Sequence, residues 1–292
     1  MSSPADPLFG SHPRSFAENF YVYPVLSRRA GGISIGINLN RDQFCNFRCI
    51  YCQVERQYRE GEAPAETAID LMRLAEELNW TIEQFASGRL FQSGRFDHTP
   101  EALRRVNDIA FSGDGEPTAF PNFAEAVAIC AEARRRHHLD DVKLVLITNG
   151  SLLHRPQVQD GLAILDRNNG EIWAKLDAGM EAYYAQVARS AVAWRQILDN
   201  LQATARVRPI VIQTLFMRIH GQQPPPEEIA AYSERLREII AAGGRIKLVQ
   251  IHTIARRPAE SYAAPLSNAE VDAIAEQVRL QTRLPVTGFY SE

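Results

Sequence analysis

The sequence lacks the features that would assign it to several common classes of protein. It has four cysteines among 292 residues, too few for a scaffold stapled by disulfides. No apolar run approaches the roughly 18 residues that a membrane-spanning helix needs. The first residues, which include Pro4, Asp6 and Pro7, contain no apolar stretch of the kind found in a secretory signal. These absences lead us to expect a cytoplasmic protein that has no membrane partner.

A strong excess of charge of one sign is also missing. The 32 Lys and Arg residues nearly balance 35 Asp and Glu residues, which gives a formal net charge of −3. Three of the basic residues are lysines, namely Lys143, Lys175 and Lys247. This balance argues against broad, non-specific binding to nucleic acid, although it is compatible with a local basic patch. The hydrophobic share of 45% and the charged share of 23% exclude a disordered chain and predict a sizeable buried core.

What the sequence does have is a cluster of cysteines. Cys45, Cys49 and Cys52 form a C-x3-C-x2-C triplet, while Cys130 stands alone in an apolar, helix-like run. Thiolates are soft ligands that favour iron–sulfur clusters, zinc and copper(I). A structural zinc site usually takes four protein ligands, whereas three thiolates suit a four-iron cluster with one iron left open. A zinc site completed by a distant His, Asp or Cys130 is the alternative.

The pattern of apolar residues alternates between strands and helices. Repeated βα units predict a parallel sheet with right-handed crossovers. About six such units favour a closed or partly closed barrel with its chemistry at the carboxyl ends of the strands, and a doubly wound open sheet is the alternative. We expect one domain, with an irregular segment over 1–32 and a partial (β/α)6 TIM-like barrel over 33–292. The predicted strands are 33–39, 108–111, 142–147, 171–176, 210–217, 246–251 and 285–288, and the predicted helices are 66–87, 100–106, 122–136, 156–165, 191–205, 225–242 and 267–282.

A glycine-rich segment follows the second predicted strand, with the sequence FSGDGEPT over 111–118. Gly113 and Gly115 lack a Cβ atom, so the backbone there can approach a ligand closely. Carbonyl oxygens of the segment and the carboxylate of Glu116 suit a ligand ammonium group. A plain turn rich in Gly, Asp and Pro explains the same residues.

The cysteine triplet resembles the signature of the radical S-adenosylmethionine (SAM) superfamily, in which an aromatic residue, here Tyr51, precedes the third cysteine. The resemblance implies that Cys45, Cys49 and Cys52 hold three irons of a [4Fe-4S] cluster and that SAM binds the fourth. Electron transfer would then cleave SAM to methionine and a 5′-deoxyadenosyl radical, which abstracts hydrogen from an unidentified substrate. The glycine-rich segment resembles the SAM-binding motif of the same superfamily. An electron donor such as a flavodoxin or ferredoxin is implied as a partner.

The resemblance also indicates further cofactor-binding residues at the ends of later strands. Lys175 and Asp177 follow the fourth strand and are candidates for the SAM carboxylate and a ribose hydroxyl, with a structural ion pair as the alternative. Asn149 closes the third strand, where a tight turn explains it equally well. Gln213 interrupts the apolar fifth strand and is either a ligand contact or a buried, satisfied amide.

Candidate substrate-binding residues come from two arginine pairs and a histidine. Arg256 and Arg257 follow the sixth strand, and guanidinium groups there suit a carboxylate or phosphate. Arg28 and Arg29 precede the first strand and are either part of an anion pocket or solvated. His252 is a candidate acid or base, and a structural role is its alternative.

Several segments together resemble one branch, the iron–sulfur oxidoreductases related to the wyosine-synthase enzymes that modify tRNA. These segments include SGDGEPT, TNGS, QTLFM and TIARRPAE. The wyosine synthase uses a second cluster with further cysteines, and here only Cys130 remains, so tRNA modification is a secondary expectation. Two further hypotheses are an electron-transfer protein that carries a cluster without cleaving SAM, and a zinc-binding module.

Overall fold

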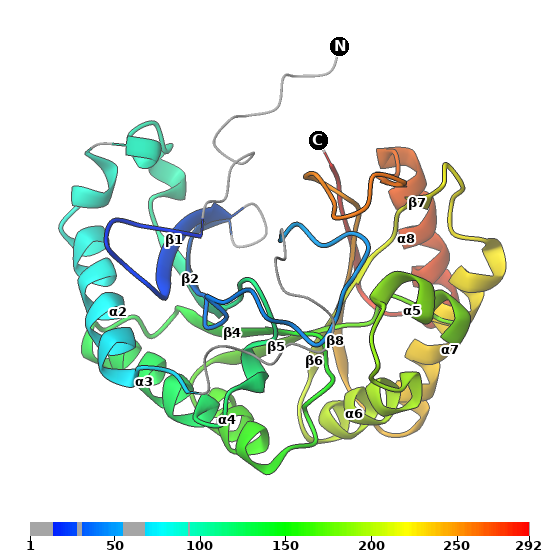
Figure 1. The fold of residues 1–292 in the computed structure, drawn as a ribbon, viewed down its shortest axis with the longest axis horizontal. Helices are drawn as coiled ribbons and strands as arrows, with labels where there is room; N and C mark the ends of the chain where they lie inside the picture. Colours follow the sequence, from blue (N-terminus) through cyan, green and yellow to red (C-terminus); the bar gives the residue numbers. More distant parts are fainter. Residues whose placement is uncertain (1–13, 28–30, 55–67, 93, 292) are drawn as a thin grey trace. The chain divides into compact units, whose positions relative to one another are not determined.

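A computed structural model describes residues 14–27, 31–54, 68–92 and 94–291 (Figure 1). The chain divides into two compact units. Unit 1 comprises Met1–Phe44, Arg59–Ile147 and Arg155–Glu171, and unit 2 comprises Cys45–Tyr58, Thr148–His154 and Ile172–Glu292. The predicted positions Arg28 and Arg29 lie outside the described residues.

The central element is an eight-stranded, mostly parallel sheet, which confirms the predicted α/β class. Its strands follow the order β1-β2-β3-β4-β5-β6-β8-β10. Strands β2 and β6 are buried along their whole length, as expected for strands of a parallel sheet covered by helices. The strands are β1 Val22–Ser27, β2 Gly32–Ile37, β3 Val106–Phe111, β4 Lys143–Thr148, β5 Gly170–Lys175, β6 Ile210–Leu215, β8 Ile246–His252 and β10 Val286–Phe289.

In the described part of unit 1, three helices flank β2, β3 and β4 (Figure 1). The Phe111 ring of β3 meets the Phe123 ring of α3 edge to face, with the ring centroids 5.6 Å apart. A Cβ atom at Gly161 of α4 would lie 2.7 Å from the Phe123 ring, so glycine is what allows α3 and α4 to pack this closely. The helices are α2 Leu71–Ala86, α3 Phe123–Arg136 and α4 Pro156–Asp166, and short 3-10 turns occupy Arg89–Phe91, Gly94–Phe96, Glu101–Leu103 and Pro117–Ala119.

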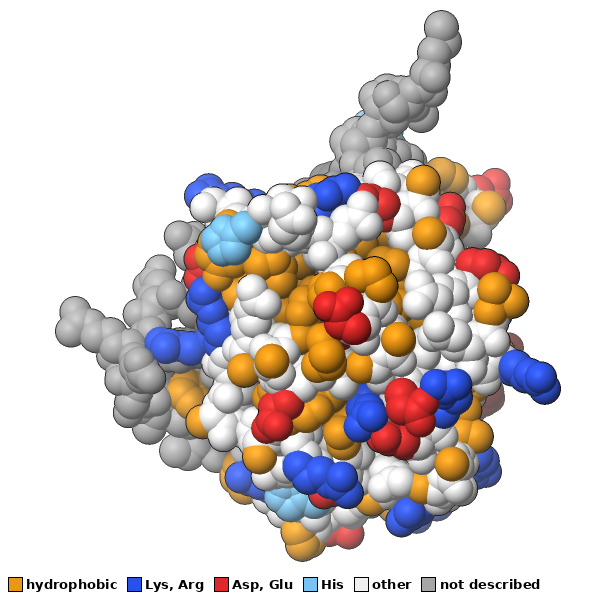
Figure 2. Space-filling model, turned by 90° about the vertical axis from the view of Figure 1, so that its right-hand side faces the viewer, with side chains coloured by type: hydrophobic (Ala, Val, Ile, Leu, Met, Phe, Trp, Pro, Cys, Tyr) orange, Lys and Arg blue, Asp and Glu red, His pale blue; other side chains and the backbone are white. Residues whose placement is uncertain are grey.

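In unit 2, four helices accompany β5, β6, β8 and β10, and the short strands β7 and β9 form a separate antiparallel pair. Ser267 and Glu270 form a capping box at the start of α8, as the sequence predicts. Figure 2 shows the side of the molecule on which α7 and α8 lie, where Lys or Arg and Asp or Glu side chains are intermingled around apolar ones. The elements are α5 Glu181–Ala188, α6 Trp194–Val207, α7 Pro226–Ala241, α8 Asn268–Thr282, β7 Arg218–Ile219 and β9 Ala263–Ala264.

Three segments differ from the sequence-based predictions. Residues expected to be irregular contain β1, which pairs antiparallel with β2 from Val22 opposite Ile37 to Ser27 opposite Gly32. The helix predicted over 100–106 is a single 3-10 turn, because the chain already pairs with β2 at Val106. Helix α5 is absent from the predicted helices, since it is short and has no side-chain cap of its own.

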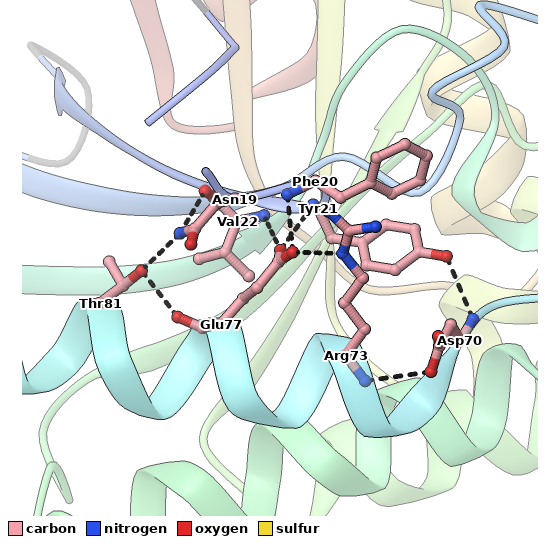
Figure 3. Close-up of polar contacts among 8 residues, drawn as sticks. All are labelled: Asn19, Phe20, Tyr21, Val22, Asp70, Arg73, Glu77 and Thr81. Carbon is pink, nitrogen blue, oxygen red and sulfur yellow. Dashed lines mark hydrogen bonds and ion pairs between the residues drawn. The ribbon is translucent and has the colours of Figure 1, made fainter. Parts of the chain in front are cut away.

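A buried carboxylate on α2 fixes the chain that leads into β1 (Figure 3). The Glu77 carboxylate accepts hydrogen bonds from the backbone N–H groups of Phe20 at 2.7 Å, Tyr21 at 2.7 Å and Val22 at 3.2 Å. The Nε atom of Arg73, one helical turn away, donates to the same carboxylate at 2.8 Å. Phe20 and Tyr21 precede the sheet ladder and Val22 begins it, so Glu77 satisfies donors that would otherwise be buried without acceptors.

We expect Glu77→Ala to lower the free energy of unfolding by about 3 kcal/mol, because the substitution leaves buried backbone donors without their acceptor. Glu76→Ala is the matched control, since Glu76 is the neighbour on the same helix and should change stability by less than about 0.5 kcal/mol. Urea unfolding monitored by circular dichroism measures both. Equal effects of the two substitutions would show that the Glu77 contacts contribute nothing specific.

Candidate functional site

The three clustered cysteines lie in a loop of unit 2 that is held by its backbone. The N–H groups of Arg48 and Ile50 donate to the carbonyl oxygens of Ala188 and Val187, each at 3.0 Å. These carbonyls belong to the last turn of α5, where no intrahelical donors remain. The two hydrogen bonds therefore fix the loop on either side of Cys49, and they involve backbone atoms of the loop and not the cysteine side chains.

The thiols of the loop are close enough to influence one another. Burial raises the pKa of the Cys49 thiol, and the negative charges of Asp177, Cys45 and Cys52 raise it further. A metal centre bound by these sulfurs reverses that balance, because its positive charge favours the thiolates. Across the described parts of the chain, no three His, Cys, Asp or Glu side chains converge as ligands of one ion. A four-iron cluster takes one thiolate per iron, so the arrangement fits such a cluster.

Asp177 brings together Tyr51 and Lys175, two residues that the sequence singled out for different reasons. The Tyr51 hydroxyl donates a hydrogen bond to Oδ2 of Asp177. Oδ1 of Asp177 lies 3.1 Å from the Lys175 Nζ and accepts a hydrogen bond from the Leu215 N–H at 2.8 Å. The Lys175 Nζ lies 5.2 Å from the centroid of the Tyr51 ring. The ion pair between Lys175 and Asp177 is therefore present, and it lies beside the residue that precedes Cys52.

Asn46, which belongs to none of the predicted site residues, connects the cysteine loop to the turn after β4. Its Oδ1 accepts from the Asn149 Nδ2 at 2.8 Å, and its Nδ2 donates to the Ser151 Oγ at 2.8 Å. The Ser190 Oγ, beyond α5, donates to the Asn46 carbonyl at 2.9 Å. The Asn200 Nδ2 on α6 donates to the carbonyls of residues 150 and 151, so the turn itself is fixed from the helix side. The sequence signal that could have identified Asn46 is its position as a polar residue directly after the first cysteine.

In unit 1, the glycines of the 111–118 segment approach protein atoms closely. A Cβ atom at Gly113 would lie 2.2 Å from the Asn38 Oδ1, and one at Gly115 would lie 2.1 Å from the Phe44 carbonyl oxygen. The carboxylate of Glu116, which is 2% exposed, accepts from the Thr118 Oγ1 at 2.6 Å. Glycine is thus required at both positions for the segment to lie against the chain that follows β2.

Asp114, between the two glycines, is held by two side chains. The Asn38 Nδ2 donates to Oδ2 of Asp114 at 2.6 Å, and the Asp114 N–H donates back to the Asn38 Oδ1 at 3.0 Å. Arg14 forms an ion pair with the same carboxylate, and its carbonyl accepts from the Arg41 Nη1 at 2.9 Å. The N-terminal chain therefore restrains the glycine-rich segment, a contact that sequence reasoning missed because the partners are 100 residues apart.

The remaining candidates have structural neighbours of their own. The Gln213 Nε2 donates to the buried Gln250 Oε1 at 2.9 Å, which agrees with the alternative of a satisfied amide. The His252 ring stacks on the Phe289 ring of β10 with centroids 4.5 Å apart. Arg256 and Arg257 are exposed on the loop after β8. This loop returns to the cysteine loop at its far end, where the Glu260 N–H donates to the Ile50 carbonyl at 3.1 Å.

The chain belongs to the radical SAM superfamily, because the sequence model of that family matches residues 39–222. It is 30% identical to a UPF0026 protein of Helicobacter pylori (strain J99) over 145 residues, which are 49% of this chain and 39% of that protein. It is 26% identical to a UPF0026 protein of Methanocaldococcus jannaschii over 251 residues, which are 83% of this chain and 65% of that protein. The chain thus spans about a third to two thirds of the length of the curated relatives it matches.

Among solved structures, one described as TYW1 with a lysine-pyruvate adduct bound is similar in fold, with a TM-score of 0.53 at 18% identity, over 86% of this chain and 74% of that chain. The family and this likeness confirm the fold class inferred from the sequence, the partial barrel of the radical SAM type. The resemblance that the cysteine triplet indicated is confirmed as well. Among the helices that the structure describes, none combines the length and the apolar character required to span a bilayer.

Proposed function

We propose that this protein is a radical SAM enzyme that carries one [4Fe-4S] cluster on Cys45, Cys49 and Cys52 and uses it to cleave SAM reductively. The observation that carries the proposal is the position of the cysteine loop, in which the Tyr51 hydroxyl donates a hydrogen bond to the Asp177 carboxylate and the charge of that carboxylate raises the pKa of the Cys49 thiol. Membership of the superfamily supports the class of chemistry. The substrate that loses a hydrogen atom is unidentified.

When bound, the cluster supplies the electron that splits SAM into methionine and a 5′-deoxyadenosyl radical. The chain's own residues bind the cluster and SAM and orient them. The three cysteines hold iron, while Lys175 offers an ammonium group and Asp177 a carboxylate to the polar groups of SAM. Gly113, Gly115 and Glu116 are proposed for the aminoacyl end of SAM, with Asn149 and Gln213 as further contacts. The exposed guanidinium groups of Arg256 and Arg257 suit an anionic substrate group.

We favour an unidentified substrate over tRNA. Cys130 is 0% exposed within α3, so it cannot contribute to a second cluster without unfolding of that helix. The side that carries α7 and α8 presents charges of both signs rather than a positive field (Figure 2). A direct readout of tRNA modification, a base change in bulk tRNA incubated with the reconstituted protein, SAM and dithionite, should therefore be negative.

Anaerobic reconstitution with iron and sulfide tests the proposal. We expect the absorbance of a four-iron cluster and formation of 5′-deoxyadenosine from SAM with dithionite as reductant. A cluster that never cleaves SAM would instead identify an electron carrier. One equivalent of zinc, no iron and stability in air would identify a zinc-binding module.

Arg14→Ala is expected to weaken SAM binding about fivefold, because it removes the cation that pairs with Asp114 within the glycine-rich segment. The cluster content should stay unchanged, since the hydrogen bonds that fix the cysteine loop run from Arg48 and Ile50 to α5 and do not involve Arg14. Equilibrium dialysis of SAM against the reconstituted protein measures the effect. Arg135→Ala, which removes an exposed ion pair with Glu132 on α3, is the control and should leave SAM binding unchanged.

A further inference from the structure

Helix α7 carries a buried carboxylate that the proposed function does not use. Glu228 is 0% exposed, whereas the preceding Glu227 is exposed on the first turn of the same helix. The Glu228 carboxylate accepts hydrogen bonds from the N–H groups of Gly179 and Met180, the latter at 3.1 Å. Met180 is the N-cap of α5 and provides no side-chain acceptor of its own. Glu228 therefore supplies, from another helix, the anion that a helix N-terminus favours.

The turn that Glu228 holds is the one that carries Asp177. A Cβ atom at Gly179 would lie 2.1 Å from the backbone nitrogen of Tyr232, so the turn lies directly against α7. The Tyr232 hydroxyl lies 2.6 Å from the Thr214 Oγ1, which donates to the Leu176 carbonyl at 2.8 Å. Residues 176–180 are thus fixed to α7 at both ends of the turn.

The far end of α5 reaches the cysteine loop. The helix has eight residues, which corresponds to a length of about 12 Å at 1.5 Å per residue. Its last two carbonyls, those of Val187 and Ala188, accept the hydrogen bonds from Ile50 and Arg48 that flank Cys49. One short helix therefore connects the Glu228 carboxylate to the loop of the cysteine triplet.

We propose that Glu228 is a positioning residue for SAM binding, which fixes the Asp177 turn and, through α5, the loop around Cys49 without touching cluster or SAM. The proposal rests on the proposed function and adds to it a residue that no cofactor motif contains. The Glu228 carboxylate can act on both the Asp177 turn and the cysteine loop. The turn leads into the N-terminus of α5, and the loop is hydrogen-bonded to its C-terminus.

Burial disfavours the charged form of Glu228, and its two backbone donors favour it. Burial raises the pKa of Glu228 from 4.5 to about 7, and the hydrogen bonds from Gly179 and Met180 partly offset this rise. Among the described residues, the titratable side chain that interacts with both Glu228 and Asp177 is Tyr183 of α5. Its own pKa is raised by burial and then by these two carboxylates, so it remains neutral; Tyr232 of α7 is likewise kept neutral by burial, which raises its pKa. The side chains of Glu181 on α5 and Glu227 on α7 are exposed and solvated.

These facts predict two pH effects of opposite sign. The folded state retains the Glu228 proton to a higher pH than the unfolded state, so this group's contribution to the free energy of unfolding falls as the pH rises from 4.5 to about 7. Over the same range the ionised carboxylate, which can accept from both N–H groups, becomes more abundant and SAM binding becomes tighter. A residue with a purely structural role would not improve ligand binding while stability declines.

The test compares the wild-type chain with Glu228→Gln, Glu228→Asp and the control Glu227→Gln. SAM dissociation constants are measured on the reconstituted proteins at about pH 6 and about pH 8, and urea unfolding on the proteins without added iron at the same pH values. We expect Glu228→Gln to weaken SAM binding about tenfold at the higher pH and to remove the part of the pH dependence of both quantities that Glu228 contributes. Glu228→Asp should recover part of the affinity, and Glu227→Gln should match the wild type.

Unchanged SAM affinity in Glu228→Gln, or an equal loss in Glu227→Gln, would overturn the positioning role. If Glu228→Gln does not fold, Glu228→Asp and the pH dependence of the wild type decide the question. SAM affinity that rises with pH while the free energy of unfolding falls would support the proposal. Changes of both quantities in the same direction would count against it. If the wild type binds neither iron nor SAM, the proposed function fails and this proposal fails with it. The unfolding data would then still report whether Glu228 anchors α5, which separates the two failures.

Discussion

Replacing Cys45, Cys49 or Cys52 with alanine is expected to remove the cluster and to lower SAM cleavage by more than about 100-fold, because in the proposed cluster each thiolate would hold a separate iron. The fold should survive each substitution. The loop is fixed by backbone hydrogen bonds from Arg48 and Ile50 to the end of α5, and those bonds do not depend on the cysteine side chains. Iron and sulfide per chain, the electron paramagnetic resonance of the reduced protein and the yield of 5′-deoxyadenosine measure the loss, and circular dichroism reports the fold.

Cys130→Ala is the matched control for these substitutions. The Cys130 thiol is fully buried in α3, where burial raises its pKa and keeps it protonated. Its removal leaves a small cavity that should cost about 1 kcal/mol of stability and no iron. Loss of the cluster in Cys130→Ala, or its retention after any of the three loop substitutions, would show that the ligands are assigned wrongly.

Asp177→Ala is expected to have the second largest effect, since a single carboxylate bonds to three groups. The substitution leaves the Lys175 ammonium without its counter-ion, releases the Tyr51 hydroxyl and removes the acceptor of the Leu215 N–H. We expect the free energy of unfolding to fall by about 3 kcal/mol and SAM binding to weaken by more than about tenfold. Urea unfolding and equilibrium dialysis of SAM measure the two effects.

Asp199→Ala provides the comparison for Asp177, because Asp199 forms an exposed ion pair with Arg195 on α6. Such a pair contributes at most about 0.5 kcal/mol, and SAM binding should not change. Tight SAM binding by Asp177→Ala in a folded protein would mean that the residues around Tyr51 are assembled for packing and not for the cofactor.

The helices and strands that the sequence predicted well are those whose apolar periodicity and capping residues lie within the element itself. Helices α3, α7 and α8 and strands β4 and β8 begin and end within about two residues of their predicted bounds. Their apolar periodicity and the cap at Ser267 are local signals. Strand β1 is different, because it is a strand only by virtue of its pairing with β2. Helix α5 is stabilised at its N-terminus by Glu228, which lies far along the chain on α7 and has no signal in its own neighbourhood.

The same distinction applies to the candidate site. The cysteines, Lys175 and Asp177 were recognisable from residue type and from their position after predicted strands. The partners that hold them were not, because a contact such as that of Asn46 with Asn149 depends on which strand ends meet. The close approach of Gly115 to the Phe44 carbonyl is equally a property of the folded chain. Sequence therefore indicates which groups can do chemistry, and tertiary structure determines what orients them.

The antiparallel strand β1 has a consequence for the solution behaviour of shortened chains. It occupies one end of the strand order, so its pairing covers the hydrogen-bonding edge of the fully buried β2. A polypeptide beginning after Ser27 would uncover that edge and would leave the Glu77 carboxylate without the amide groups it accepts from. Uncovered apolar strands recruit strands from other molecules, so such a polypeptide should self-associate and precipitate. Proteolytic removal of β1 should have the same effect for the same reason.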